Sequence, residues 1–376
     1  MSATLTDTYQ PVCVALGERS YDIIIGNDLL SQAHVLIRPH LASNKVLVVT
    51  DKTVGALYQD ALNLEELDVV YVHVEDGETS KSFETLQTVL DAMFEHGLDR
   101  NDTLIALGGG IVGDLTGFAA SIYKRGCRFV QIPTTLLAQV DSAVGGKTAI
   151  NVRHGKNLIG AFYQPTLVLA DMSVLSSLPD RQVKAGYAEI LKYGLLGNKD
   201  FFDWLTLNGA KILSGDRTLA AEAVRISCET KAQIVANDEK ERGQRALLNL
   251  GHTFAHALEA EAGYSGDLLH GEAVSAGMEM AFDYSVATGF CASADLERLR
   301  RHLKKHKLVD IDRIAPLLAR PDNLLAHMQQ DKKNEGGEIT LILARGIGEA
   351  FVHKGALQET VSNYLKYLAV EHGHKS

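Results

Sequence analysis

Three short stretches in the second half of the chain carry the residues best suited to hold a metal ion. They are otherwise apolar and helix-like, and they read GYAEILKYG (186–194), NLGHTFAHALE (249–259) and LLHGEA (268–273). Together they supply one carboxylate and three imidazoles: Glu189, His252, His256 and His270. Two histidines and one carboxylate with an open fourth position form the ligand set of a catalytic rather than a structural zinc. We therefore expect a metal that can bind and polarise substrate oxygens.

The spacing of the histidines bears on which of them are ligands. His252 and His256 are four residues apart, so they lie on one face of a helix. Spacing alone selects these two as the pair of ligands. The run HTFAH lacks the glutamate of an HExxH motif, so a metalloprotease is not indicated.

A glycine-rich turn about a hundred residues earlier predicts a dinucleotide site. In LIALGGGIVGD (104–114), Gly108, Gly110 and Gly113 fit the pattern G-x-G-x-x-G between an apolar run and a helical segment. Glycine lets the backbone approach a pyrophosphate, whose charge the helix N-terminus favours. A hydride carrier beside a metal leaves few reactions open.

The glycine turn departs from the usual dinucleotide pattern in two ways. It follows the third apolar run of this half rather than the first, and the acidic residue expected about twenty positions later is missing. Asp51, at the end of KVLVVTD, could supply adenosine contacts instead, as could Glu78 and Lys81 of the GETSK stretch. Asp114 could cap the turn or reach the nicotinamide.

Cations gather in two segments that we expect to form glycine loops. DSAVGGKTAIN (141–151) contains Lys147, and HGKNLIG (154–160) contains Lys156 and Asn157. A single lysine is usually a solvated surface charge, but two in adjacent loops favour an anionic ligand. Lys192 follows Glu189 by three residues and so shares its helix face.

Composition narrows the functional class. The 376 residues carry a net charge of −10 without a basic patch, which argues against a general nucleic-acid binder. The four cysteines form no CxxC pair, which suits a reducing compartment. Without a secretory signal or a long apolar run, we expect a cytoplasmic protein that does not enter the membrane.

The pattern of apolar residues divides the chain near residue 177. Before it, strand-like runs at 45–51, 69–76, 103–110, 128–134 and 166–171 alternate with helical segments at 53–61, 80–96 and 111–122, and Ser80 is the expected N-cap of the second helix. An early hairpin (11–17 and 20–25) and a late one (338–345 and 349–355) are also expected. After residue 178 helical segments dominate. We predict an α/β domain with a mainly parallel, Rossmann-like sheet at 1–177 and a mainly α-helical, metal-binding domain at 178–376.

Taken together, these motifs resemble the 3-dehydroquinate synthase family. They are GGGIVGD, QIPTTLLAQVDSAVGGKTAIN, GKNLIGAFYQP, AGYAEILKYG, LNLGHTFAHALE, LLHGEAVSAGM and DKKN, in the family's order between residues 108 and 334. The resemblance implies conversion of 3-deoxy-D-arabino-heptulosonate 7-phosphate to 3-dehydroquinate and phosphate, a step of the shikimate pathway. It implies transient oxidation by NAD, phosphate elimination, re-reduction and aldol cyclisation. It also implies a divalent metal, usually zinc, with cobalt as an alternative.

The resemblance assigns roles to individual residues. It makes Glu189, His252 and His270 the metal ligands, against the spacing, and leaves His256 as a proton carrier or phosphate contact. Arg125 matches an arginine that the family delivers to a neighbouring subunit, which implies a homodimer. The substrate positions are Asp141, Lys147, Asn157, Lys192, Lys231, Arg245, Asn249, His256 and Lys332 or Lys333. The NAD positions are Asp51, Glu78, Lys81, Gly109, Gly110, Asp114, Thr134 and Thr135, with Lys147 and Lys156 beside them. The residues expected to act in catalysis are His256, Lys147, Lys192, Asn157, Arg125 and Lys156.

Three other functions fit parts of the pattern. A related sugar-phosphate cyclase would act on a substrate without the carboxylate, and such relatives tend to depart from the GGKTAIN loop. A metal-dependent polyol dehydrogenase would release NADH with each turnover and has little use for so many lysines. A non-catalytic metabolite sensor would commonly have lost a metal ligand or a pocket cation, and all are present here.

Overall fold

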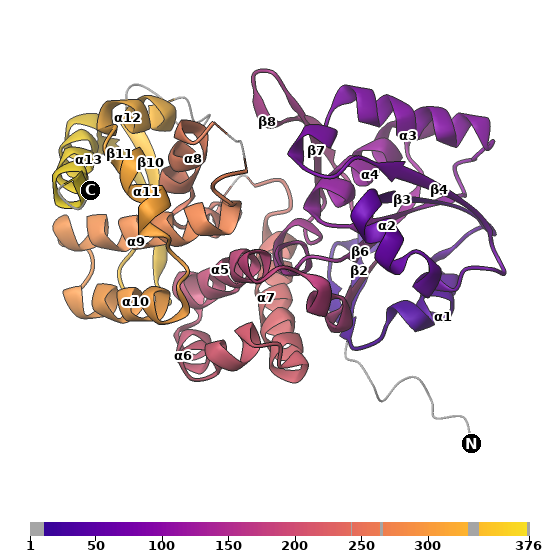
Figure 1. Cartoon of the computed structure of the whole chain (residues 1–376), viewed down its shortest axis with the longest axis horizontal. Helices are drawn as coiled ribbons and strands as arrows, with labels where there is room; N and C mark the ends of the chain where they lie inside the picture. Colours follow the sequence, from indigo (N-terminus) through magenta and orange to yellow (C-terminus); the bar gives the residue numbers. More distant parts are fainter. Residues whose placement is uncertain (1–10, 242, 264–265, 330–337, 374–376) are drawn as a thin grey trace. The chain divides into compact units, whose positions relative to one another are not determined.

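The computed structural model describes residues 11–241, 243–263, 266–329 and 338–373. The chain forms two compact units, and Figure 1 labels most of their helices and many of their strands. The first comprises Met1–Pro179 and Gly215–Lys240, and the second comprises Asp180–Ser214 and Glu241–Ser376. The predicted single boundary at 177 therefore differs from the structure, because residues 215–240 return to the first unit.

The first unit is built on a seven-stranded sheet in the order β1-β2-β9-β6-β5-β3-β4. Its strands are β1 (Val12–Val14), β2 (Tyr21–Gly26), β3 (Lys45–Asp51), β4 (Asp68–Val74), β5 (Thr103–Gly108), β6 (Arg128–Pro133) and β9 (Leu167–Asp171). All neighbours pair in parallel except β1 and β2, which form the expected early hairpin at one edge. The five strand-like runs of the first half and the mainly parallel sheet are thus confirmed.

Helices cover the sheet because alternate strand residues are apolar on both faces. Leu47 and Val49 of β3 pack in one core with α3 and α4, whereas Val46 and Val48 pack in another with α1. The helices and short turns of this unit are η2 (Gly17–Arg19), η3 (Leu30–Gln32), α1 (Ala33–Ile37), η4 (Arg38–His40), α2 (Lys52–Tyr58), η5 (Asp60–Leu62), η6 (Glu78–Ser80), α3 (Phe83–Glu95), α4 (Gly110–Ile122), η7 (Tyr123–Arg125), η8 (Ala138–Ser142), η9 (Met172–Ser177) and α7 (Arg217–Asn237). Burial on both faces is the expected state of a parallel sheet.

The N-cap of α3 is Ser82, not Ser80 as predicted. The Ser82 side chain accepts a hydrogen bond from the backbone N–H of Thr85 at 3.3 Å. Ser80 instead ends the short turn η6, where its hydroxyl donates to the Gly77 carbonyl at 2.7 Å. Two cap-type residues two positions apart give the same sequence signal, and the turn at Gly77 decides between them.

The strand order explains why the glycine turn follows β5, which is the third of the five predicted apolar runs, and not the first run. After β3 the chain adds β4 on one side of it, and then returns to add β5 on the other side. The order in which strands are added therefore reverses between β3 and β5, although these strands run parallel. Ligands of open α/β sheets bind outside the carboxyl ends of the strands at such a switch point. Asp51 ends β3 and Gly108 ends β5, so both lie at that position.

The two expected glycine loops are instead the strands of an antiparallel hairpin, β7 (Lys147–Val152) and β8 (Gly155–Phe162). Lys147 is the first residue of β7, and Lys156 and Asn157 lie in β8. The sequence concealed this hairpin because β8 is largely exposed and contains two glycines. One of them, Gly160, packs so closely on the backbone of β7 that a Cβ would overlap the Thr148 carbonyl.

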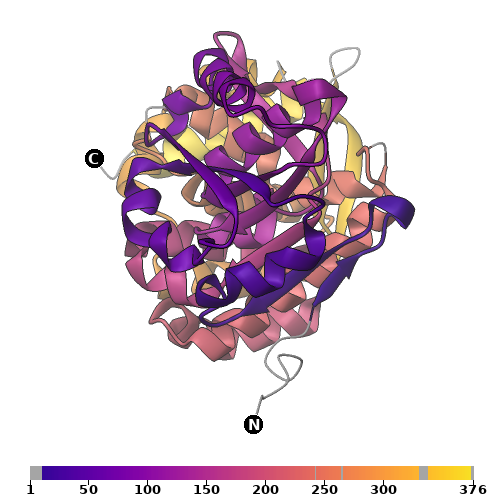
Figure 2. The same ribbon diagram turned by 90° about the vertical axis from the view of Figure 1, so that its right-hand side faces the viewer.

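Helix α7 belongs to the first unit although it follows 35 residues of the second. It contacts β1, β2 and η8, and Cys228 and Ala232 on its inner face are buried. The Cys228 thiol lies 3.4 Å from the Gln139 carbonyl of η8. Figure 2 shows α7 running beside the β1–β2 edge of the sheet.

The second unit is mainly helical, as predicted. Its elements are α5 (Asp180–Gly197), α6 (Lys199–Leu213), η10 (Gln244–Asn249), α8 (His252–Glu261), α9 (His270–Ala287), α10 (Ser293–His306), α11 (Ile311–Leu318), α12 (Pro321–Gln329), β10 (Glu338–Ala344), β11 (Ala350–Leu357) and α13 (Gln358–Gly373). Strands β10 and β11 pair antiparallel and form the expected late hairpin. No helix in the described part of the chain is both long and apolar enough to span a bilayer.

Candidate functional site

Glu189, His252 and His270 converge in the second unit as a candidate metal centre. Glu189 lies within α5, while His252 and His270 are the first residues of α8 and α9. One ligand atom from each residue lies within 4.8 Å of the others. Glu189 Oε1 is 3.6 Å from His252 Nε2 and 3.4 Å from His270 Nε2.

These separations fit a tetrahedral zinc. Zinc binds nitrogen and carboxylate oxygen at about 2.0–2.2 Å, which places neighbouring tetrahedral ligand atoms roughly 3.3–3.5 Å apart. The 3.4 Å distance from Glu189 Oε1 to His270 Nε2 falls in that range, and the 3.6 Å distance to His252 Nε2 lies just above it. Three protein ligands leave a fourth position for a substrate oxygen, which is the arrangement of a catalytic site.

Close packing of α8 on α9 brings the two histidines together. Gly251 precedes α8 with φ +76°, a conformation that favours glycine, and a Cβ there would lie 2.5 Å from the Met278 nitrogen of α9. A Cβ at Gly277 would likewise lie 2.9 Å from the Ala255 nitrogen. The two helices can therefore approach this closely because both contact residues lack a side chain.

His256 does not belong to the ligand cluster, so the choice made by spacing alone is wrong. Its ring is edge-on to that of His252 at 5.4 Å and lies 6.4 Å from that of His270. The side chain is exposed, whereas His252 is buried. The residue that completes the cluster comes from the next helix, which helical periodicity cannot indicate.

Buried charges set the protonation of the cluster. The Lys192 ammonium pairs with Glu189, and both side chains are almost fully buried. Burial, reinforced by Lys192, lowers the pKa of His252 well below its ordinary value, which favours the neutral imidazole that a metal requires. For His270, burial acts to lower the pKa, but Glu259 and Glu189 raise it to about 10. Metal binding at His270 therefore competes with a proton and weakens as the pH falls.

Two other predicted substrate residues of the second unit lie in η10, directly before α8. Arg245 is buried at 1% exposure, and the Asn249 side chain donates to Glu241 Oε1 at 2.9 Å. Turn η10 contacts α5, the helix of Glu189 and Lys192. The remaining predicted cations, Lys332 and Lys333, lie outside the described residues.

The predicted nucleotide residues of the first unit gather at the ends of β5 and β6. A Cβ at Gly109 would meet the Thr135 side chain at 3.2 Å, and one at Gly110 would meet Ser142 Oγ at 2.8 Å. The Thr134 and Ser142 hydroxyls are buried without a hydrogen-bond partner within the described residues. The backbone at Gly109 and Gly110, which we call the cradle, carries no side chains of its own, and the unsatisfied hydroxyls beside it fit the binding of a polar ligand such as NAD.

Lys81 and Asp114 form a buried ion pair next to this cradle. Lys81 Nζ lies 2.5 Å from Asp114 Oδ2, and it also donates to the Asn157 side chain of β8. Burial raises the pKa of Asp114 despite the opposing effect of Lys81. Asp51, at the end of β3, accepts a hydrogen bond from Val54 at 2.7 Å and so caps α2. Lys81 therefore links Asp114, a predicted nucleotide residue, to Asn157, a predicted substrate residue.

Asn151 is a residue that the sequence did not single out. Its side chain donates to Glu78 Oε1 at 2.6 Å and accepts from the Asn157 backbone N–H at 2.9 Å. Asn157 has φ +55°, and this hydrogen bond supports that conformation. Lys156 approaches Glu78 to 3.9 Å on the same hairpin. The only available signal for Asn151 was its place as the last residue of GGKTAIN.

Asp141 and Lys231 meet although 90 residues separate them. Lys231 of α7 donates to Asp141 Oδ1 at 2.5 Å and to the Asp141 carbonyl at 2.7 Å. Lys231 is buried, and Asp141 lies in η8. The return of α7 to the first unit is what brings this predicted substrate pair together. Lys147, by contrast, is exposed at the start of β7.

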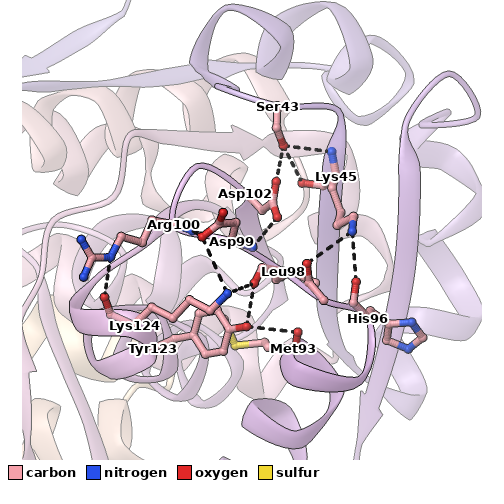
Figure 3. Close-up of polar contacts among 11 residues, drawn as sticks. Ser43, Lys45, Met93, His96, Leu98, Asp99, Arg100, Asp102, Tyr123 and Lys124 are labelled. Carbon is pink, nitrogen blue, oxygen red and sulfur yellow. Dashed lines mark hydrogen bonds and ion pairs between the residues drawn. The ribbon is translucent and has the colours of Figure 1, made fainter.

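Arg125 is exposed on a turn with unusual backbone conformation. Lys124 and Arg125 have φ values of +45° and +69°, and Gly126 follows with φ +120°. Hydrogen bonds hold the turn: Arg100 Nε donates to the Lys124 carbonyl at 2.8 Å, and Lys124 Nζ donates to the Leu98 carbonyl at 2.6 Å (Figure 3). Tyr123 also donates to the Leu98 carbonyl, at 2.8 Å. Strained turns held in this way are typical of functional positions.

The family models and the curated relatives that match this chain agree on one family. The model of the 3-dehydroquinate synthase N-terminal domain matches residues 71–185, and that of the C-terminal domain matches residues 186–334. A 3-dehydroquinate synthase of Rhodospirillum rubrum is 52% identical over 91% of this chain and 91% of its own. One from Caulobacter vibrioides is 52% identical over 94% of this chain and 97% of its own. Among solved structures, a 2-epi-5-epi-valiolone synthase from Streptomyces hygroscopicus with NAD+ and Zn2+ bound has a TM-score of 0.85 and 31% identity, covering 95% of this chain and 99% of its own.

Proposed function

The chain belongs to the 3-dehydroquinate synthase family, and from this premise we propose that it converts 3-deoxy-D-arabino-heptulosonate 7-phosphate to 3-dehydroquinate and inorganic phosphate. The observation that carries the proposal is the Glu189–His252–His270 cluster within a chain 52% identical to such enzymes. The reaction breaks a carbon–oxygen bond as phosphate leaves, so the enzyme is a lyase.

Two cofactors are assigned to residues of this chain. Glu189, His252 and His270 would hold zinc, which acts as a Lewis acid on substrate oxygens. The cradle at Gly109 and Gly110 would hold NAD, which takes hydride from the substrate and later returns it. Cobalt could replace zinc in the same ligand set.

The chain's cations suit a substrate with both a phosphate and a carboxylate. Lys192 and Arg245 are buried in the second unit, and Lys231 is buried in the first. These cations already have contacts within the protein, and an anionic substrate would give them a further role. Lys147 and Lys156 of the hairpin add exposed or half-exposed charge.

We infer that His256 carries a proton or contacts the phosphate and does not bind the metal. It is exposed next to two ligands, and its ring lies 5.4 Å from that of His252. The substrate's own phosphate could serve as the base of the elimination, in which case the protein mainly positions it. His256 would then assist the reaction without being indispensable.

A coupled assay tests the proposed reaction. With the heptulosonate phosphate, NAD and zinc, the enzyme should release phosphate continuously while the absorbance of NADH stays flat, because the hydride returns to the product. A chelator should stop phosphate release, and added zinc should restore it. NADH produced in step with turnover would instead indicate a polyol dehydrogenase, and activity on sedoheptulose 7-phosphate alone would indicate a related cyclase.

The active enzyme is a homodimer in this proposal, and it works in the cytoplasm. The support for the homodimer is Arg125, which is exposed on its strained turn and makes no ion pair within the described residues. Mixing an inactive Arg125→Ala subunit with an inactive Glu189→Gln subunit should restore part of the activity, since one site of the mixed dimer would be complete. No recovery in a verified mixed dimer would contradict delivery of Arg125 across subunits.

A further inference from the structure

We propose that Glu259 is a positioning residue of the metal centre, which orients the imidazole of His270. The proposal rests on the metal site of the proposed function. It concerns a residue that neither the motifs nor the spacing singled out.

The geometry places the two sides of the His270 ring against different carboxylates. His270 Nδ1 lies 3.3 Å from Glu259 Oε2, while Nε2 lies 3.4 Å from Glu189 Oε1. A carboxylate accepts but does not donate, so the Nδ1 proton is directed at Glu259. The lone pair of Nε2 is thereby left for the metal, in the tautomer that ligation requires.

Glu259 is suited to this task because it is itself fixed. It lies near the end of α8, the helix that begins with the ligand His252, and is only 7% exposed. A carboxylate buried to this degree is costly unless it accepts hydrogen bonds, so its position is closely tied to its partners. One helix therefore supplies both a ligand and the group that orients another ligand.

The two ligating histidines are held by different groups. His252 Nδ1 lies 3.2 Å from the Leu250 carbonyl, a neutral acceptor. Carboxylates and backbone carbonyls are the usual partners of the second nitrogen of metal-binding histidines, and carboxylates make the ligand more basic. His270 is thus the ligand whose binding strength depends on a single side chain.

The backbone of His270 is fixed separately from its ring. Glu272 accepts from the Leu269 N–H at 2.9 Å and so caps α9, of which His270 is the first residue. Arg181 of α5 donates to both oxygens of Glu272, at 2.6 and 2.7 Å. With the helix start held in this way, the remaining freedom of His270 is rotation of the ring, which Glu259 restricts.

Zinc affinity of the whole enzyme, measured by competition with a chromophoric chelator, tests the proposal without relying on activity. Removing such a partner typically weakens metal binding by roughly 10–100-fold. We expect that loss for Glu259→Gln, which keeps the size of the side chain. We expect a smaller loss for Glu259→Asp, which keeps the charge.

Glu261→Gln is the matched control. Glu261 lies on the same helix and accepts from Arg320 at 2.9 Å and from His327 at 3.1 Å, away from the metal ligands. The Glu261→Gln protein should bind zinc with an affinity within about twofold of that of the wild type. Comparable melting temperatures of the metal-free Glu259→Gln and Glu261→Gln proteins would show that the difference in affinity is local.

The possible results separate this proposal from the one beneath it. If Glu259→Gln bound zinc as tightly as the wild type, the role of Glu259 would be overturned and the metal site would stand. The same holds if Glu259→Gln and Glu261→Gln weakened zinc affinity equally. If the wild type itself bound no zinc, the metal site would fall and this proposal with it. If Glu259→Gln did not fold, an affinity of Glu259→Asp equal to the wild type would overturn the role.

Discussion

His302 offers a prediction whose size follows from the structure. It lies on α10 in the metal-binding unit, is 3% exposed, and its Nε2 is 3.1 Å from the hydroxyl of Tyr187 on α5. Burial, helped by His306 and Lys305, lowers the pKa of His302 from 6.5 to about 3. Because α5 also carries Glu189, protonation of His302 would disturb the helix that supplies a metal ligand.

The sign of the effect follows from proton linkage. Between pH 6.5 and 3 the unfolded chain binds a proton at His302 that the folded chain does not. The stabilising contribution is therefore complete above pH 6.5 and is lost as the pH falls. At 1.36 kcal/mol per pKa unit, the loss between pH 7.5 and pH 5 is about 2 kcal/mol.

The chain's single tryptophan provides the assay. Trp204 lies on α6, where its ring stacks on Phe201 at 5.9 Å, and the adjacent Phe202 ring is 5.6 Å from His302. Its fluorescence during urea unfolding should report on this region. With a urea m-value of about 2–3 kcal/mol/M, a loss of about 2 kcal/mol in the free energy of unfolding corresponds to a drop of roughly 0.7–1 M in the urea midpoint.

Comparison of variants isolates His302 from the other groups that titrate. The drop in midpoint between pH 7.5 and pH 5 should shrink by that amount in His302→Gln, which cannot take up a proton. His96→Gln, which alters an exposed histidine, should keep the full drop of the wild type. A His302→Gln protein with the same pH dependence as the wild type would refute the reasoning.

Three further predictions concern the candidate sites. Asp141→Asn leaves Lys231 without its carboxylate partner and should destabilise the first unit by about 1–3 kcal/mol, measured by urea unfolding; recovery should follow from adding Lys231→Met, and its absence would count against the pair. Gly110→Ala places a Cβ 2.8 Å from Ser142 Oγ and should weaken NAD binding at least tenfold in calorimetry, whereas Gly197→Ala, which has open space, should not. His256→Ala should retain more than about a hundredth of wild-type phosphate release if the substrate phosphate is the base, since a general acid–base group contributes roughly 10²–10⁴-fold, and complete loss with zinc still bound would contradict this.

Elements that depend on local pattern were predictable from the sequence. The five predicted strands of the first half are short apolar runs, and all of them except the edge strand β4 are mostly buried. Their alternate residues pack in the two cores on opposite faces of the sheet. For the second half the sequence predicted that helical segments dominate, and the second unit is mainly helical. Where two signals lay close together, as with Ser80 and Ser82, the pattern could not choose between them.

Features that depend on tertiary packing were not predictable from pattern. Helix α7 has the same periodicity as its neighbours, and nothing in it indicates a return to the first unit. Hairpin β7–β8 is half exposed and glycine-rich, so it lacks the apolar alternation of a strand. Both bear on the proposed function, because they position the predicted substrate residues Lys231 and Asn157.

The candidate metal ligands show the same difference between what local pattern predicts and what tertiary packing decides. Family resemblance identified His270, whereas helical spacing favoured His256, since periodicity reports only neighbours on one helix. Ser142, Asn151 and Glu259 gave no signal of their own. Each acts through a contact with a residue at least six positions away in the chain, Gly110, Asn157 or His270.

Anomalous X-ray diffraction at the zinc edge, from crystals grown with zinc and NAD, would locate the metal and the dinucleotide in one experiment. We predict one strong peak per chain, bonded to Glu189, His252 Nε2 and His270 Nε2, and electron density for NAD on the Gly109–Gly110 turn. A peak bound to other residues, or a dinucleotide seated away from the Gly109–Gly110 turn, would contradict the account.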